Sequence, residues 1–120
     1  HNLGWIAITN GPGDALLYSC KLLRVCERAK GQVEAAVTYW RYKLPILETI
    51  VNPIGAGDAT TAMTLICWAV GVSPVDAFCA GLAAGGASCL VADNSCFDLS
   101  SVSAILNDIK VFYVTEKSPP

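Results

Sequence analysis

The sequence predicts an α/β domain in which strands come first and three helices follow. Short apolar runs rich in β-branched and aromatic residues, separated by Gly- and Pro-containing turns, fill much of the first half. From Asp58 onward, apolar residues recur at helical spacing over longer segments. A length of 120 residues is enough for one hydrophobic core but not for two. We therefore expect one domain that spans residues 1–120.

Strand-like segments occupy the first half of the chain. The run "WIAIT", Trp5–Thr9, is apolar and is followed by the turn sequence "NGPGD". The next run, Ala15–Cys20, fits either a return strand or the first turn of a helix, and its periodicity does not separate the two. After a polar loop, Val33–Pro45 and Ile46–Val51 are both extended in character, and Pro45 breaks the chain between them.

The second half of the chain carries standard start and stop signals for helices. The run "DATTAMTLICWAVG" begins at Asp58, and Gly71 is a favourable residue just beyond a helix end. The next helix opens with Ser73 as its N-cap and Pro74 at its first position. Its many small residues allow close packing against a neighbouring element.

The third predicted helix is Leu99–Lys110, and we expect Ser100 or Ser101 to cap it. The closing "SPP" is interpreted as a frayed end. No internal repeat or low-complexity segment interrupts this order. The prediction is therefore strands followed by three helices.

Charge and hydropathy argue against two classes of partner. Eight Lys and Arg residues against ten Asp and Glu residues give a net charge of −2, so no overall basic field indicates nucleic-acid binding. Six of the eight basic residues lie between Lys21 and Lys43, which we interpret as a solvated face or loop. The best candidate for a membrane span, Ala77–Ala92, is rich in Gly and Ala and too short. We expect no nucleic acid and no membrane as partners.

The six cysteines include no C-x-x-C pair, and the single histidine is His1, which argues against a zinc site. Cys67, Cys79 and Cys89 lie within apolar helical pattern and are interpreted as small buried hydrophobic residues. Unpaired thiols fit a reducing compartment, so we expect a cytoplasmic protein.

The stretch "GAGD", Gly55 to Asp58, stands at the start of the first predicted helix. A helix N-terminus presents unpaired N–H groups and a partial positive charge, and glycines let a ligand approach its backbone. A carboxylate beside such an anion site could accept a proton from an attacking hydroxyl. Asp58 could equally be a plain helix cap, and these four residues alone do not decide between the two hypotheses.

Three segments, in order, resemble the PfkB (ribokinase-like) carbohydrate kinases. "NPIGAGDATTAM", which begins at Asn52, is similar to the family signature D-T-x-G-A-G-D. "IAITNGPGDALLY", which begins at Ile6, is similar to its nucleotide-binding strand–turn–strand, and "AFCAGLAAGGASCL" to its small-residue helix. The resemblance implies the C-terminal part of a Rossmann-like ribokinase fold, with Ala15–Cys20 as a strand. Asn52 and Pro53, in place of Asp-Thr, are closest to the 1-phosphofructokinase and tagatose-6-phosphate kinase branch.

The resemblance implies ATP-dependent phosphoryl transfer to a hydroxyl of a sugar or sugar phosphate, with ATP and Mg²⁺ as cofactors. Asp58 matches the family's catalytic base. The residues that match the anion hole are Gly55, Ala56 and Gly57. The residues that match the turn along the nucleotide are Thr9, Asn10 and Gly11. Because Asn52 replaces a carboxylate near the expected monovalent-cation site, K⁺ dependence stays open.

The resemblance also implies a missing portion and leaves alternatives. The N-terminal part that holds the sugar site and lid in the family has no counterpart here, so we expect the 120-residue chain alone to be inactive. A homodimer stays open. One alternative is a catalytically silent kinase-like module that binds a nucleotide or a partner.

A second alternative is a dinucleotide-binding domain. Gly11, Pro12 and Gly13 after a strand imitate the start of G-x-G-x-x-G, and Glu34 stands where an acidic residue is expected. The third glycine position, however, is Leu16, so the match is partial.

Overall fold

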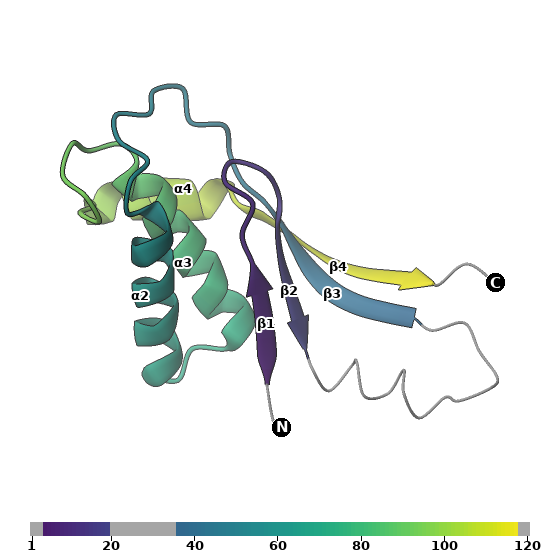
Figure 1. Ribbon diagram of the computed structural model, residues 1–120. Helices are drawn as coiled ribbons and strands as arrows, with labels where there is room; N and C mark the ends of the chain where they lie inside the picture. The colour runs from purple at the N-terminus through teal and green to yellow at the C-terminus, as the bar shows by residue number, and fades with distance from the viewer. Residues whose placement is uncertain (1–3, 20–35, 118–120) are drawn as a thin grey trace. The chain divides into compact units, whose positions relative to one another are not determined.

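The computed structural model describes residues 4–19 and 36–117 (Figure 1). The chain divides into two compact units, which we name the sheet unit and the helical unit. The sheet unit comprises His1–Lys43 and Val111–Pro120, and the helical unit comprises Leu44–Lys110. Within the described ranges, every helix is too short or too polar to cross a bilayer.

The sheet unit contains one four-stranded sheet in the order β1-β2-β3-β4. Its strands are β1 (Trp5–Ile8), β2 (Ala15–Ser19), β3 (Ala36–Lys43) and β4 (Lys110–Lys117). The β1–β2 and β2–β3 pairs are antiparallel. β4 also runs antiparallel to β3, because Thr38 contacts Thr115 while Trp40, further along β3, contacts Tyr113, earlier in β4.

Both faces of this sheet carry apolar and aromatic side chains. Residues that pair directly across strands share a face, and Ala15 pairs with Tyr42, both fully buried. On the opposite face, the rings of Tyr18 and Tyr39 lie 5.0 Å apart. An antiparallel sheet with one solvated face alternates apolar and polar residues. Strand β2 departs from this alternation, because the side chains on both of its faces are apolar or aromatic from Ala15 to Tyr18.

The helical unit contains α2 (Ala56–Ala69), α3 (Pro74–Ser88) and α4 (Leu99–Asp108). α2 ends in a Schellman motif, in which Gly71 has φ +98°. The N–H of Gly71 donates to Trp68 O at 3.1 Å, and that of Val72 donates to Cys67 O at 3.0 Å. The prediction that Gly71 terminates this helix is confirmed.

The start of α3 is also as predicted. Ser73 is the N-cap, its Oγ accepts a hydrogen bond from Asp76 N at 3.3 Å, and Pro74 occupies the first helical position. Nearly all of α3 from Ala77 to Ser88 is buried. Its small side chains therefore make it the central helix of this unit.

α2 and α3 approach each other through glycines. A Cβ placed on Gly81 would collide with Thr64 Oγ1 and lie 2.6 Å from Thr60 O. A Cβ on Gly85 would collide with Thr60 Oγ1 and lie 3.0 Å from Ala56 O. The Thr60 and Thr64 hydroxyls donate to Ala56 O and Thr60 O, one turn earlier in α2, at 2.9 and 2.7 Å. The first turn of α2 therefore lies against α3.

The α/β class and the three helices between residues 56 and 108 are as predicted, but the sequence pattern misses one strand. It predicts a helix up to Lys110 and a frayed end, whereas Lys110–Lys117 forms β4. The apolar and β-branched residues of this segment favour a strand. The signal that was missed is the strand propensity of these residues, which begin just after the helix ends at Asp108.

Two further expectations are wrong. Ile46–Val51 forms no strand, because the N–H groups of Val51 and Asn52 both donate to Cys89 O instead of to a neighbouring strand. The N-cap of α4 is Asp98, one residue before the helix, and not Ser100 or Ser101.

The Ser100 hydroxyl is used elsewhere: it donates to Asp98 Oδ2 and, as the main cause, lowers the pKa of that carboxyl below its usual value. Other expectations concern residues outside the described ranges. These are the polar loop, most of the basic cluster, Glu34, His1, Cys20 and Cys26.

Candidate functional site

Helix α2 begins directly after Gly55, which adopts the left-handed conformation with φ +87°. Non-glycine residues rarely adopt this conformation. A Cβ at this position would also collide with Ser95 Oγ and lie 2.8 Å from Ser95 N. Two independent constraints therefore require glycine at residue 55, and together they determine the direction in which α2 starts.

The first turn of α2 presents unpaired N–H groups. Ala56 N donates to Pro53 O at 3.3 Å, and Ala59 N donates to Gly55 O at 3.0 Å. Among residues 4–19 and 36–117, the N–H groups of Gly57 and Asp58 make no hydrogen bond. A Cβ on Gly57 would find nothing within 4 Å, so the backbone there is open. This terminus is chemically suited to an anion.

Asp58 is the third residue of α2 and is exposed. The helix start has no side-chain cap, and the described part of the chain offers the Asp58 carboxylate no hydrogen-bond or salt-bridge partner. The plain-cap hypothesis is therefore wrong for this residue, whose only structural benefit is a favourable charge at the positive end of the helix. Its carboxylate is available to a ligand.

Two loops frame the start of α2: residues 51–55 before it and residues 89–95 after α3. The N–H of Val51 donates to Cys89 O at 2.8 Å, and Ser95 Oγ donates to Gly55 O at 3.2 Å. Ser95 has φ +58°, so this contact holds a non-glycine residue in the left-handed region.

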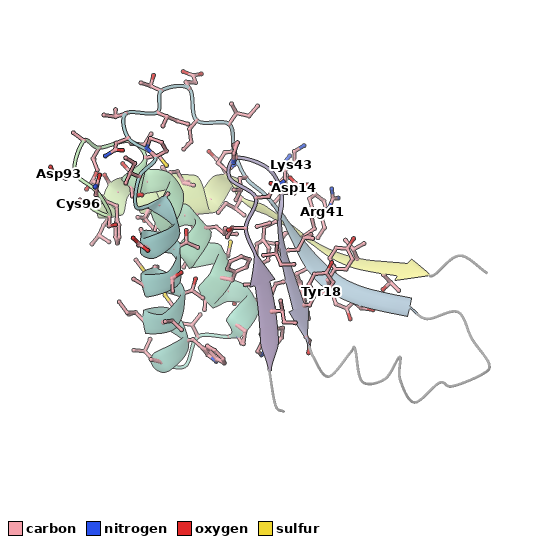
Figure 2. All side chains as sticks on the ribbon, in the orientation of Figure 1. Asp14, Tyr18, Arg41, Lys43, Asp93 and Cys96 are labelled. Carbon is pink, nitrogen blue, oxygen red and sulfur yellow. The ribbon has the colours of Figure 1, made fainter. Side chains whose placement is uncertain are left out.

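The second loop contains Asp93, and Cys96 directly follows the loop. Both residues are labelled in Figure 2. Ser95 is not among the site residues predicted from the sequence. Its signal is the cluster of turn-forming residues in "ADNSCFD".

The other predicted site residues, Thr9, Asn10 and Gly11, are exposed in the β1–β2 turn of the sheet unit. Gly11 has φ +50°, and Gly13 N donates to Asn10 O at 2.8 Å. Gly13 supplies space and not a positive φ, because a Cβ there would lie 2.7 Å from Asn10 Nδ2. The structure thus groups Gly55 to Asp58 at one helix terminus and Thr9 to Gly11 at one turn of a separate unit.

The dinucleotide-binding alternative is overturned by the element that comes after this turn. That fingerprint requires a helix whose N-terminus receives the pyrophosphate. The chain instead enters strand β2 at Ala15.

Some titratable groups outside this helix terminus have structural partners. Arg41 Nη1 lies 3.2 Å from Asp14 Oδ2, and its guanidinium stacks 4.9 Å from the centre of the Phe112 ring. Figure 2 shows Asp14 and Arg41 side by side on the sheet unit. Burial, with a smaller contribution from the Asp76 charge, raises the pKa of the Cys79 thiol to about 11.

Burial raises the pKa of Cys89 as well. Cys79 and Cys89 are thus buried thiols as predicted, whereas Cys67 is partly exposed. Within the described ranges, no three His, Cys, Asp or Glu side chains gather as metal ligands would.

No family model matches this chain, and no curated protein sequence matches it either. Solved structures do. A crystal structure of a provisionally assigned phosphofructokinase from Staphylococcus aureus matches with TM-score 0.69 and 19% identity over 92% of this chain. Phosphofructokinase-2 from Escherichia coli in complex with potassium matches with TM-score 0.65 and 17% identity over 88% of this chain.

These similarities define the fold of the chain. It is an α/β arrangement that corresponds to a C-terminal part of the phosphofructokinase-like ribokinase fold, which confirms the predicted fold class. The chain spans only 30% and 28% of the two neighbours' lengths. At 17–19% identity, the likeness concerns the fold and not the chemistry.

Proposed function

We propose that this chain is the nucleotide-binding portion of a PfkB-type carbohydrate kinase, closest to the branch that phosphorylates sugar phosphates. The open N-terminus of α2, with the unpartnered Asp58 carboxylate in its first turn, carries this proposal. A structural role explains Gly55, whereas Asp58 gains from folding only a favourable charge at the positive end of the helix.

In the proposed reaction, Asp58 accepts the proton of the acceptor hydroxyl as its oxygen attacks the terminal phosphorus of ATP. The new O–P bond forms while the bond to the leaving ADP breaks. The backbone of Gly55, Ala56 and Gly57 faces the negative charge on the transferred group, and the free N–H groups stabilise it. Thr9, Asn10 and Gly11 line the nucleotide.

We propose that the acceptor site lies on a part of the enzyme outside this chain. Two observations support this proposal. The chain spans less than a third of either structural neighbour, and α2 exposes large apolar side chains, including Leu65 and Ile66. A surface of this kind suits contact with further protein. For the sugar or sugar phosphate, this proposal therefore specifies only that a hydroxyl accepts the phosphoryl group.

Bound ATP in this fold is expected with Mg²⁺, which would neutralise phosphate charge. The phosphates are the Mg²⁺ ligands that this proposal uses, and Asp58 stays free to act as the base. A role for K⁺ depends instead on Asn52.

The test is calorimetric titration of the 120-residue chain with Mg·ATP and Mg·ADP. We expect binding that Gly57→Val abolishes, because a branched side chain would fill the open space before the first turn. Asp58→Asn is the matched variant: it removes charge but no volume. It should leave Mg·ATP affinity unchanged or tighter, because a carboxylate repels phosphate.

In a longer enzyme that contains this chain, Asp58→Asn should lower kcat by roughly 10²–10⁴-fold, the usual contribution of a general base. Equal loss of affinity in Gly57→Val and Asp58→Asn would contradict the division of roles. Binding with unchanged kcat in Asp58→Asn would favour the silent nucleotide-binding module.

A further inference from the structure

The side-chain amide of Asn52 makes three hydrogen bonds. Its Nδ2 donates to Ala92 O at 2.9 Å and to Asn94 Oδ1 at 2.6 Å, and its Oδ1 accepts from Ile54 N at 3.1 Å. A carbonyl can only accept and a backbone N–H can only donate, so these partners determine which end of the amide is which. Asn52 therefore joins the loop before α2 to the loop after α3.

These bonds bear directly on the candidate phosphate site. The segment that Asn52 holds leads to Gly55, whose left-handed conformation starts α2. The opposite loop carries Ser95, which packs against Gly55 and donates to its carbonyl. If the two loops separated, the direction of the first turn of α2 would no longer be determined. Asn52 is therefore a positioning residue for this terminus.

The residues at this place do not fit a monovalent cation. Such an ion needs several oxygen ligands that face it, and K⁺ is commonly held by carbonyl oxygens. Here the two candidate oxygens, Ala92 O and Asn94 Oδ1, already accept the N–H groups of Asn52. The neutral amide supplies no negative charge. An ion would have to displace both hydrogen bonds.

We propose that the Asn52 amide takes the place of a bound K⁺: its two N–H groups bridge the oxygens that an ion would otherwise draw together. The candidate phosphate site is then assembled without K⁺. The part of this inference that rests on the proposed function is that the ligand at the start of α2 is a phosphate. The loop bridge itself stands on the hydrogen bonds and is testable without nucleotide.

The test compares thermal unfolding in KCl and in choline chloride at equal ionic strength, with no nucleotide present. The unsubstituted chain should melt at the same temperature in both salts. Asn52→Asp replaces the donor with a charged acceptor and brings three oxygen atoms together. It should melt roughly 5 °C lower in choline chloride and recover in KCl. The control Asn52→Ala should melt lower in both salts.

Two results would overturn the inference. One is a melting temperature of the unsubstituted chain that rises with K⁺, and the other is an equal fall of Asn52→Asp in both salts. If Asn52→Asp does not fold, the melting temperatures of the unsubstituted chain in the two salts decide the test. Mg·ATP affinity, where binding is observed, should differ by less than about twofold between the two salts, whereas a tenfold gain in KCl, about 1.4 kcal/mol, would contradict the inference.

Discussion

Three neighbouring residues at the start of α2 have different physical roles. Gly55 is required by its backbone conformation and by the close approach of Ser95. Gly57 has open space around it and no positive φ, so nothing within the described structure demands glycine there. Asp58 has no structural partner among the described residues. Folding contacts of the described residues therefore require Gly55 but neither Gly57 nor Asp58.

Alanine substitution at the two glycines separates these roles. Gly55→Ala should destabilise the chain by about 1–3 kcal/mol, the usual cost of a strained backbone, with the Ser95 collision in addition. Gly57→Ala lies inside the helix, where alanine is favoured over glycine by about 0.5–1 kcal/mol, and should stabilise it. Urea unfolding followed by far-UV circular dichroism measures both. A similar loss in the two variants would mean that Gly57 is also structural.

The pair of helices α2 and α3 holds the site in place at the scale of the elements. Gly81 and Gly85, one turn apart, lie against Thr60 and Thr64, also one turn apart. The contact extends to Ala56 O at the first residue of α2. Because the threonine hydroxyls bond within their own helix, the close contact leaves neither hydroxyl unsatisfied.

Substitution along α3 tests this close contact. Gly81→Ala should destabilise the chain by about 1–3 kcal/mol, as expected when a well-packed contact is overfilled. Gly86→Ala is the matched control in the same helix, since its Cβ would lie 3.4 Å from Ile105 Cδ1, a flexible side-chain end. It should be neutral or slightly stabilising. If both variants unfold at the urea midpoint of the unsubstituted chain, α2 and α3 do not pack as closely as described.

At the scale of the whole molecule, apolar surface distinguishes this chain from an ordinary small domain. The second half of α2 exposes Leu65 (53%) and Ile66 (62%), and its C-cap residue Val70 is 74% exposed. Each of these side chains loses favourable burial when it faces water. The same helix ends in a complete Schellman motif and packs closely on α3, so this surface belongs to a well-formed element.

We expect this surface to bind a hydrophobic dye. Combined Leu65→Lys and Ile66→Lys substitutions should lower the fluorescence of bound anilinonaphthalene sulfonate at least twofold. Stability should change by no more than about 1 kcal/mol, since exposed substitutions usually cost within 0.5 kcal/mol each. Thr61→Lys, also exposed on α2, is the control for added charge. Dye binding that is unchanged by the double substitution would place the accessible apolar surface elsewhere.

The features that could be predicted from the sequence depend on residues within about one helical turn of each other. Gly71 ends α2, while Ser73 and Pro74 start α3, because caps act through local backbone geometry. The GAGD stretch is placed at a helix start for the same reason. The strand β4 is missed although its signal is local, because the predicted helix before it extends two residues too far, from Asp108 to Lys110.

The sequence by itself determined the α/β class and the main helix boundaries, and it predicted the residues of the candidate phosphate site. Only the tertiary structure decided how that site is held. The bridge from Asn52 to Asn94 and the contact of Ser95 with Gly55 join residues about 40 positions apart. No periodicity or capping rule reaches that far, since such contacts exist only after α2 and α3 have packed.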